Sequence, residues 1–184
     1  MKIFLLNSEI KKIFKHKKEL EKKLNVSIVF EKNFVSVEGN VIDEYAAEQI
    51  IRALAVGFNF KIALFLEDPD YLFEEINIKK YASGKRLQQI KARIIGTRGR
   101  ALKTLMQLTD CMIVLYENRV AMIGRTENIK FAIQSVQSIV YGSKHGNVYA
   151  RLERLMSKPE ENDLGLREIK KPVPKKKIEK KKAL

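Results

Sequence analysis

The heptapeptide Ile-Ile-Gly-Thr-Arg-Gly-Arg at residues 94–100 interrupts a helical pattern at two glycines. Apolar residues recur at helical spacing on both sides of it: Leu87, Ile90 and Ile94 after Ser83-Gly84, then Leu102, Leu105, Met106 and Leu108. The stretch therefore predicts two helices that are joined by the turn Gly96-Thr97-Arg98-Gly99.

Strands are expected on either side of this helix pair. Residues 112–116 and 119–123 are rich in β-branched and large apolar residues, and Glu117-Asn118 between them predicts a hairpin turn. A strand is expected around residues 76–81, and a helix with apolar residues from Ile129 to Val140 is expected to end at Gly142. The unit runs strand, helix, GTRG turn, helix, strand, strand, helix.

The same order of elements occurs earlier in the chain. Residues 28–57, laid over residues 113–142 without a gap, share identical residues at Ile28/Ile113, Val29/Val114, Asn33/Asn118, Val35/Val120, Gly39/Gly124, Ala47/Ala132, Gln49/Gln134 and Gly57/Gly142. Only about two identities are expected by chance. The first copy is expected to hold strands at 2–6, 26–30 and 34–38 and helices near 9–14, 17–24 and 41–56.

These patterns predict an α+β protein built from two repeats. The first repeat takes residues 1–58, and the second takes residues 76–142. The linker at 59–75 is expected to hold a short helix that is broken by Asp68-Pro69-Asp70. A C-terminal helix is expected within 143–157, and the polar, Lys-rich segment 158–184 is expected to be a disordered basic tail.

The chain is strongly basic. Its 184 residues carry 36 Lys and Arg against 22 Asp and Glu, which gives a net charge of +14. Residues 167–184 hold nine Lys or Arg and two Glu, so this segment and the rest of the chain each carry +7. We therefore expect the folded part itself to bind a polyanion.

Several classes of protein are disfavoured. The single cysteine, Cys111, allows no intrachain disulfide and favours a reducing, cytoplasmic setting. His16 and His145 have no metal-ligand spacing, so neither a metal nor another cofactor is expected. No apolar run is long enough for a membrane span, and the start does not resemble a signal peptide. No carboxylate pair, Cys/His pair or Walker-type loop predicts an enzyme.

The GTRG turn has the chemistry of a phosphate clamp. Glycines carry no Cβ, so the backbone can approach a ligand closely, and the amides that begin the following helix favour an anion. Arg98 and Arg100 add cationic donors. Two glycines three residues apart are more often a simple helix joint, so the surrounding elements must support the functional interpretation.

A GxxG turn between two helices, preceded by Ile94-Ile95 and followed by an Ile-Val-Leu strand, resembles the type I KH domain, a three-stranded antiparallel sheet with three helices. The resemblance implies that the chain holds two such domains in tandem and that the loop grips single-stranded nucleic acid. The RNA-binding residues that it implies are the loop Gly96, Thr97, Arg98 and Gly99 with Ile95 beneath it, the groove floor Ile113 and Leu115, and the flanking cations Lys91, Arg93, Arg100 and Lys103. For each flanking cation, solvated surface charge is an equally good interpretation.

The first copy departs from this pattern. Where the loop should fall, residues 14–18 read Phe-Lys-His-Lys-Lys, without glycine. We expect a degenerate KH domain that is kept for packing and protein contacts, although its lysines can attract RNA without sequence preference.

The strand at 112–116 is apolar on both faces, since Cys111, Ile113 and Leu115 alternate with Met112, Val114 and Tyr116. A sheet with helices on one side should be polar on the other. We therefore expect the first copy or the C-terminal helix to cover the second face, which would make one rigid two-domain body.

Residues 113–149 resemble the Pno/Dim family of small-subunit ribosome assembly factors, and the linker from Gly57 to Leu72 resembles that of the archaeal members. The resemblance covers about residues 1–157 and is strong for residues 58–157. The most specific stretch is Gly142-Ser-x-x-Gly-x-Val-Tyr149, which lies outside the generic KH fold. The resemblance implies a noncatalytic factor that binds the 3′ region of small-subunit rRNA and helps to position or restrain the endonuclease that trims that end. It also implies other assembly factors and the alpha subunit of translation initiation factor two as partners.

Two alternatives stay open at the level of sequence. The related Krr family of assembly factors also has a KH pair with a divergent first domain. A KH accessory module of an RNA-degrading complex is the other alternative, although the S1-like barrel that usually accompanies such modules is missing from the sequence.

Overall fold

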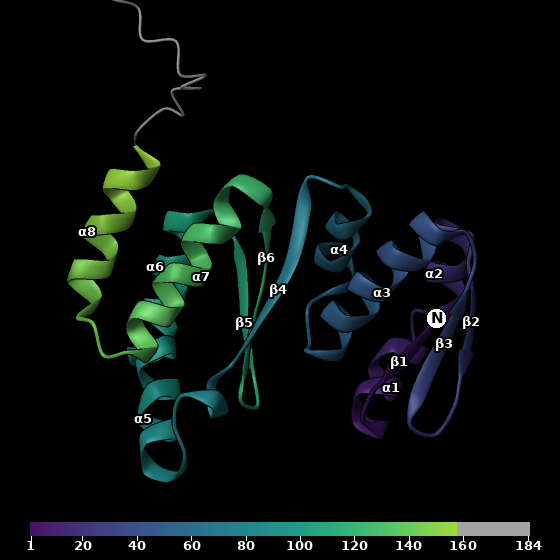
Figure 1. Cartoon of the computed structure of the whole chain (residues 1–184), viewed down its shortest axis with the longest axis horizontal. Helices are drawn as coiled ribbons and strands as arrows, with labels where there is room; N and C mark the ends of the chain where they lie inside the picture. The colour runs from purple at the N-terminus through teal and green to yellow at the C-terminus, as the bar shows by residue number, and fades with distance from the viewer. Residues whose placement is uncertain (158–184) are drawn as a thin grey trace, which may run out of the picture.

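Two three-stranded antiparallel sheets, each with its own helices, make up residues 1–157, which are the part of the chain described by the structure, a computed structural model (Figure 1). The predicted α+β class is confirmed. The predicted disordered tail at 158–184 lies outside the described residues.

The first half, residues 1–58, has the sheet order β1-β3-β2. Its elements are β1 (Lys2–Phe4), α1 (Asn7–Phe14), α2 (Lys17–Leu24), β2 (Ser27–Phe30), β3 (Phe34–Glu38) and α3 (Val41–Ala55). The short helix α4 (Phe60–Ala63) and the 3-10 turn η1 (Leu64–Glu67) connect it to the second half.

The second half, residues 71–142, has the equivalent sheet order β4-β6-β5. Its elements are β4 (Tyr71–Asn77), the 3-10 turn η2 (Ile78–Lys80), α5 (Gly84–Ile95), η3 (Thr97–Gly99), α6 (Arg100–Thr109), β5 (Met112–Tyr116), β6 (Arg119–Arg125) and α7 (Thr126–Val140). The last helix, α8 (His145–Met156), follows it.

The strand register confirms the sequence repeat. Ile28 pairs with Val37 in the first hairpin, and Ile113 pairs with Met122 in the second. Both members of the second pair lie 85 residues after their counterparts, which is the offset of the sequence alignment. The two hairpins therefore use the same pairing, and the identical residues occupy equivalent positions.

The first strand of the second half was predicted too late in the chain. It was expected around residues 76–81, but β4 spans Tyr71–Asn77 and so occupies part of the predicted linker 59–75. Asp68-Pro69-Asp70 conceals its start, because the strand begins directly after this break and pairs Tyr71 with Arg125. Residues 78–80 form a 3-10 turn instead, and the Asn77 side chain accepts a hydrogen bond from the Lys79 amide (3.0 Å).

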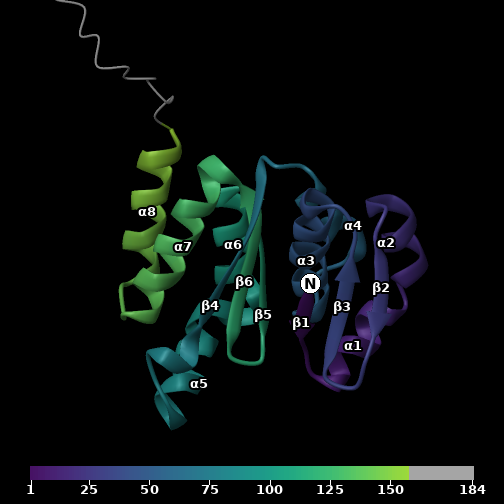
Figure 2. The same cartoon turned by 45° about the vertical axis from the view of Figure 1, so that its right-hand side comes forward.

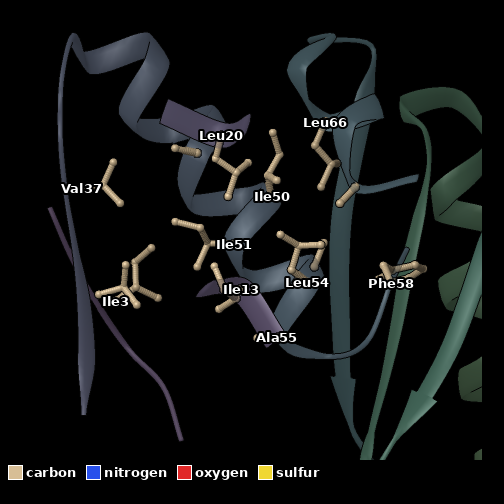
Figure 3. Close-up of a cluster of buried hydrophobic side chains, with 14 of the residues drawn as sticks. Ile3, Ile13, Leu20, Val37, Ile50, Ile51, Leu54, Ala55, Phe58 and Leu66 are labelled. Atoms are coloured by element: carbon tan, nitrogen blue, oxygen red, sulfur yellow. The ribbon is translucent and has the colours of Figure 1, made fainter. Parts of the chain in front are cut away.

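The sheet of the second half is covered on both faces. Its outer face packs on α3 of the first half and on α4 of the connection, as Figure 2 shows. Ala121 and Ile123 on this sheet belong to the core of the first half. Phe58 is one of the buried side chains of the first half (Figure 3). Its ring meets that of Phe73 on β4 edge to face, with ring centroids 6.4 Å apart. The prediction that a neighbour covers this strand face is confirmed. The neighbour is the first half, whereas α8 packs on α6 and α7.

An ion pair also joins the two halves. Arg119 on β6 pairs with the carboxylate of Glu9 on α1, whose side chain is only 3% exposed, and with Glu75 on β4 at 3.5 Å. Glu9 accepts a further hydrogen bond from the Leu6 amide (2.9 Å). Nearby, the Lys12 ammonium lies 4.0 Å from the centre of the Tyr116 ring. Apolar burial and a buried charge therefore fix the halves against each other.

Candidate nucleic-acid interface

The GTRG turn has a backbone that ordinary residues adopt at a cost. Gly96 ends α5 with φ 71° and ψ 176°, Arg98 has φ 54°, and Gly99 has φ 74°. A Cβ on Gly96 would lie 2.5 Å from the Cβ of Ala101, so both conformation and space demand glycine there. This geometry brings α6 back against the end of α5.

Gly99 serves a different purpose. A Cβ at this position would meet no atom within 4 Å, so packing within the described protein does not exclude a side chain. Glycine at this position leaves the space beside the backbone open. An incoming phosphate or sugar can therefore approach the chain at Gly99 closely.

Two backbone donors of the turn are unpaired. The N–H groups of Thr97 and Arg98 have no acceptor within residues 1–157, although Gly96 donates to Ala92 and Gly99 donates to Gly96 (2.8 and 3.2 Å). Both residues are exposed. Amides of this kind ahead of a helix are suited to an anion, because the helix dipole adds to their partial positive charge.

The surrounding cations are available for an anionic ligand. Arg98, Arg100 and Lys103 are exposed, Lys91 is half-buried, and none of the four has an acidic partner within the described residues. Ile95, which precedes the loop, is 38% exposed and offers an apolar surface beside these charges. The structure thus gathers Lys91, Ile95 and residues 96–100 with Lys103 around one turn.

Three of the residues predicted to bind RNA are buried or hydrogen-bonded within the protein: Ile113, Leu115 and Arg93. Ile113 is only 3% exposed and packs in the core of the second half, so its role as groove floor stays a prediction. It points toward the helices because it shares the inner face of the sheet with its partner Met122. Leu115 is partly buried in the same cluster. Arg93 donates to the Ser143 carbonyl (2.6 Å), so it is engaged within the protein.

The lone cysteine does not supply a nucleophile. Cys111 is buried and its thiol donates to the Thr109 carbonyl at 3.3 Å. Burial raises the pKa of the Cys111 thiol to about 11, which keeps it protonated at neutral pH. Within residues 1–157, no group of three or more His, Cys, Asp or Glu side chains is placed to hold a metal ion. None of the helices in the same range is long and apolar enough to cross a membrane.

The turn, its open backbone and its cations form a candidate nucleic-acid interface. Residues 72–157 match the family model of the second KH domain of Pno1, which is described as a eukaryotic type KH-domain of type I. The match includes α8, which the generic expectation of three helices leaves out.

Relatives extend the similarity over most of the chain. A KH domain-containing protein of Methanocaldococcus jannaschii is 32% identical over 145 residues, which are 75% of this chain and 64% of that protein. The pre-rRNA-processing protein pno1 of Aspergillus oryzae is 30% identical over 118 residues, or 62% of this chain and 45% of that protein. The chain thus spans about half to two thirds of the curated relatives that it matches.

A solved structure agrees with these relatives. The crystal structure of the a/eIF2alpha-aDim2p-rRNA complex from Pyrococcus horikoshii contains a chain that is 25% identical and superposes with a TM-score of 0.77, covering 84% of this chain and 92% of that one. The chain described here is similar to the Pno/Dim family of KH-domain proteins, and the predicted resemblance to the archaeal members is confirmed.

Sequence reasoning missed two residues at the edge of this interface. Ser143 and His145 lie about fifty residues beyond the GTRG loop, yet both contact Arg93 in the last turn of α5. The motif that contains them was recognised only as a mark of the family. Nothing in helical periodicity connects it to the loop.

Proposed function

We propose that this protein binds single-stranded RNA through the GTRG turn of its second half, and that it acts without catalysis as a small-subunit ribosome assembly factor on the 3′ region of the rRNA. The observation that carries the proposal is the turn itself, with unpaired Thr97 and Arg98 amides, an open Gly99 and cations without acidic partners. The backbone amides and the cations hold phosphates, and the adjacent apolar surface supports bases.

The proposal includes a division of labour between tandem KH domains. The second domain runs from about Tyr71 to Gly142 and binds the RNA. Residues 1–58 form a degenerate KH domain that supports the second one and takes part in protein contacts. In favour of this assignment, the two halves share strand order and hairpin register. The basic segment 158–184, with its high lysine content, adds affinity without sequence preference.

The partners follow from the relatives. The Pyrococcus structure is a complex with rRNA and a/eIF2alpha, so we propose small-subunit rRNA and the alpha subunit of translation initiation factor two as partners of this chain. The endonuclease that trims the rRNA 3′ end is proposed as a further partner, which the assembly factor positions or restrains.

The decisive variant carries Thr97→Asp and Arg98→Asp. Both glycines remain, so the turn should persist, while two carboxylates replace a hydroxyl and a guanidinium beside the phosphate path. Affinity for an oligonucleotide of the rRNA 3′ region should fall about 30-fold to 1000-fold, which corresponds to about 2–4 kcal/mol. Binding is measured at one fixed salt concentration, together with the melting temperature.

The second half offers a matched control. Arg125→Asp with Thr126→Asp changes the same two residue types and the same charge at the other end of the domain. α6 leads away from the GTRG turn to β5, whose first residue, Met112, pairs with Ile123, two residues before Arg125. This variant should lose affinity only about threefold or less through the general charge effect. Equal affinity of the loop variant and the wild type would refute the proposal, and so would cleavage of labelled RNA by the pure protein.

A further inference from the structure

The motif that marks the family, Gly142-Ser-x-x-Gly-x-Val-Tyr149, lies against the end of the helix that leads into the GTRG turn. The Arg93 guanidinium donates to the Ser143 carbonyl at 2.6 Å. In return, Nε2 of His145 lies 2.9 Å from the Arg93 carbonyl oxygen. Two hydrogen bonds therefore connect one residue of α5 to the segment that begins α8.

The bond from His145 satisfies a helix end. The Gly96 amide donates a hydrogen bond to the Ala92 carbonyl, and the chain then leaves the helical path. The next carbonyl of α5, that of Arg93, therefore has no backbone amide from which to accept a hydrogen bond. Because a carbonyl only accepts, Nε2 of His145 must carry the proton. An imidazole from a distant helix thus completes the last turn of α5, three residues before Gly96.

The same segment also contacts the helix that follows the loop. α8 packs on α6, and Tyr149 is partly buried against the core of the second half. Val148 and Leu152 are 5% and 1% exposed and pack into the core of the second half. α8 therefore touches both helices that support the GTRG turn, although it contributes no residue to the turn itself.

We propose that His145 is a positioning residue for RNA binding, which together with Ser143 and Arg93 holds the end of α5 so that the GTRG backbone is presented in one orientation. The inference rests on the proposed function of the loop. It assigns Arg93, which the sequence suggested as an RNA contact, to the support of the loop.

The Arg93 to Ser143 bond is exposed and the His145 bond is only partly buried. Bonds of this kind add little to global stability, because water competes for the same groups. A group that must meet phosphates is sensitive to small displacements, however, since a site needs to be held within about half an ångström of its productive geometry. Loss of the bond should therefore affect binding more than folding.

The test uses the full chain with His145→Ala and His145→Gln. The Gln amide can donate to the Arg93 carbonyl, whereas Ala cannot. We expect about a tenfold weaker affinity of His145→Ala for the rRNA 3′ oligonucleotide and recovery to within about twofold in His145→Gln. The backbone amide resonances of Gly96 and Gly99 should shift in the Ala variant while its melting temperature stays close to that of the wild type.

A triple variant, which adds His145→Ala to the loop variant, separates positioning from packing. If His145 acts through the loop, its loss should weaken binding no further when Thr97 and Arg98 are already Asp, so the effects are non-additive. An unchanged affinity of His145→Ala, or fully additive losses, would overturn the inference. Equal binding by the loop variant and the wild type would instead overturn the proposed function of the loop.

Discussion

The turn between the first two helices differs between the halves of this molecule, although their sheets are equivalent. Lys2 and Ser36 pair across 34 residues in the first half, whereas Glu75 and Ala121 pair across 46 in the second, so the second half has twelve more residues between these strand positions. They lengthen both helices, the turn between them and the connection from β4 to α5. The first half joins α1 and α2 through Lys15 and His16, both with negative φ.

This difference shows that the strained turn is not needed for the topology. The first half reaches the same strand order with a simple right-handed connection between two short helices. The second half keeps Gly96, Arg98 and Gly99 in left-handed conformations, which are less favourable for folding. A feature that folding does not require, and that exposes free amides, is best explained by a ligand.

The halves also differ in what covers their sheets. The outer face of the first sheet is open, with Phe4 and Val29 exposed by 77% and 48%. The outer face of the second sheet is closed by the first half. The first half thus acts as the support of the second, and its own open sheet face remains accessible.

The largest expected effect is on stability, and it comes from removing the ion pair that joins the two halves. Arg119→Ala would leave the Glu9 carboxylate buried with the Leu6 amide as its remaining donor, so the free energy of unfolding should fall by about 3–5 kcal/mol. Urea unfolding measures it. The control is Arg52→Ala, which removes an exposed pair with Glu48 and should cost about 1 kcal/mol or less. Equal effects of the two variants would show that the joint does not depend on this ion pair.

The next effect distinguishes the two glycines of the loop. Gly96→Ala should lower stability by about 2–3 kcal/mol, because a left-handed φ is combined with a contact to Ala101. Gly99→Ala meets no neighbour and should cost only about 1 kcal/mol. Its methyl group would nevertheless occupy the open approach to the backbone, and RNA affinity should fall about tenfold.

Chemical denaturation and RNA titration of the two variants provide the comparison. Gly99→Ala is the informative variant, since its loss of affinity should exceed its loss of stability in free-energy terms. A Gly99→Ala protein that binds RNA as tightly as the wild type would mean that the backbone at this position is not approached by the ligand.

The sequence predicts correctly those features that show as a pattern along the chain, and it does not predict contacts between residues that lie far apart in the chain. The repeat, the hairpins and the GTRG turn come from local patterns, and the apolar strand at 112–116 correctly indicated a covered second face. β4 was misplaced because its alternation begins directly after Asp68-Pro69-Asp70, a break that suggests a loop. The roles of Arg93 and His145 were hidden, because their contact joins helices about fifty residues apart.

The smallest effect is expected at the first-half turn. Lys15→Ala, Lys17→Ala and Lys18→Ala together should leave the preferred RNA sequence unchanged, because a turn without glycine cannot bring its backbone close to the RNA. Lys17 is also held by Glu21 at 3.6 Å, so at most Lys15 and Lys18 are free for phosphates, and the slope of log affinity against log salt should fall by about 1.4 or less. The matched variant carries Arg98→Ala, Arg100→Ala and Lys103→Ala, and it should weaken binding much more for the same change of charge. Selection of bound sequences from a random RNA pool, with salt titration of both variants, checks the contrast. A changed sequence preference after the first-half substitutions would make that turn a second specific contact, and the two halves would then share the recognition of RNA.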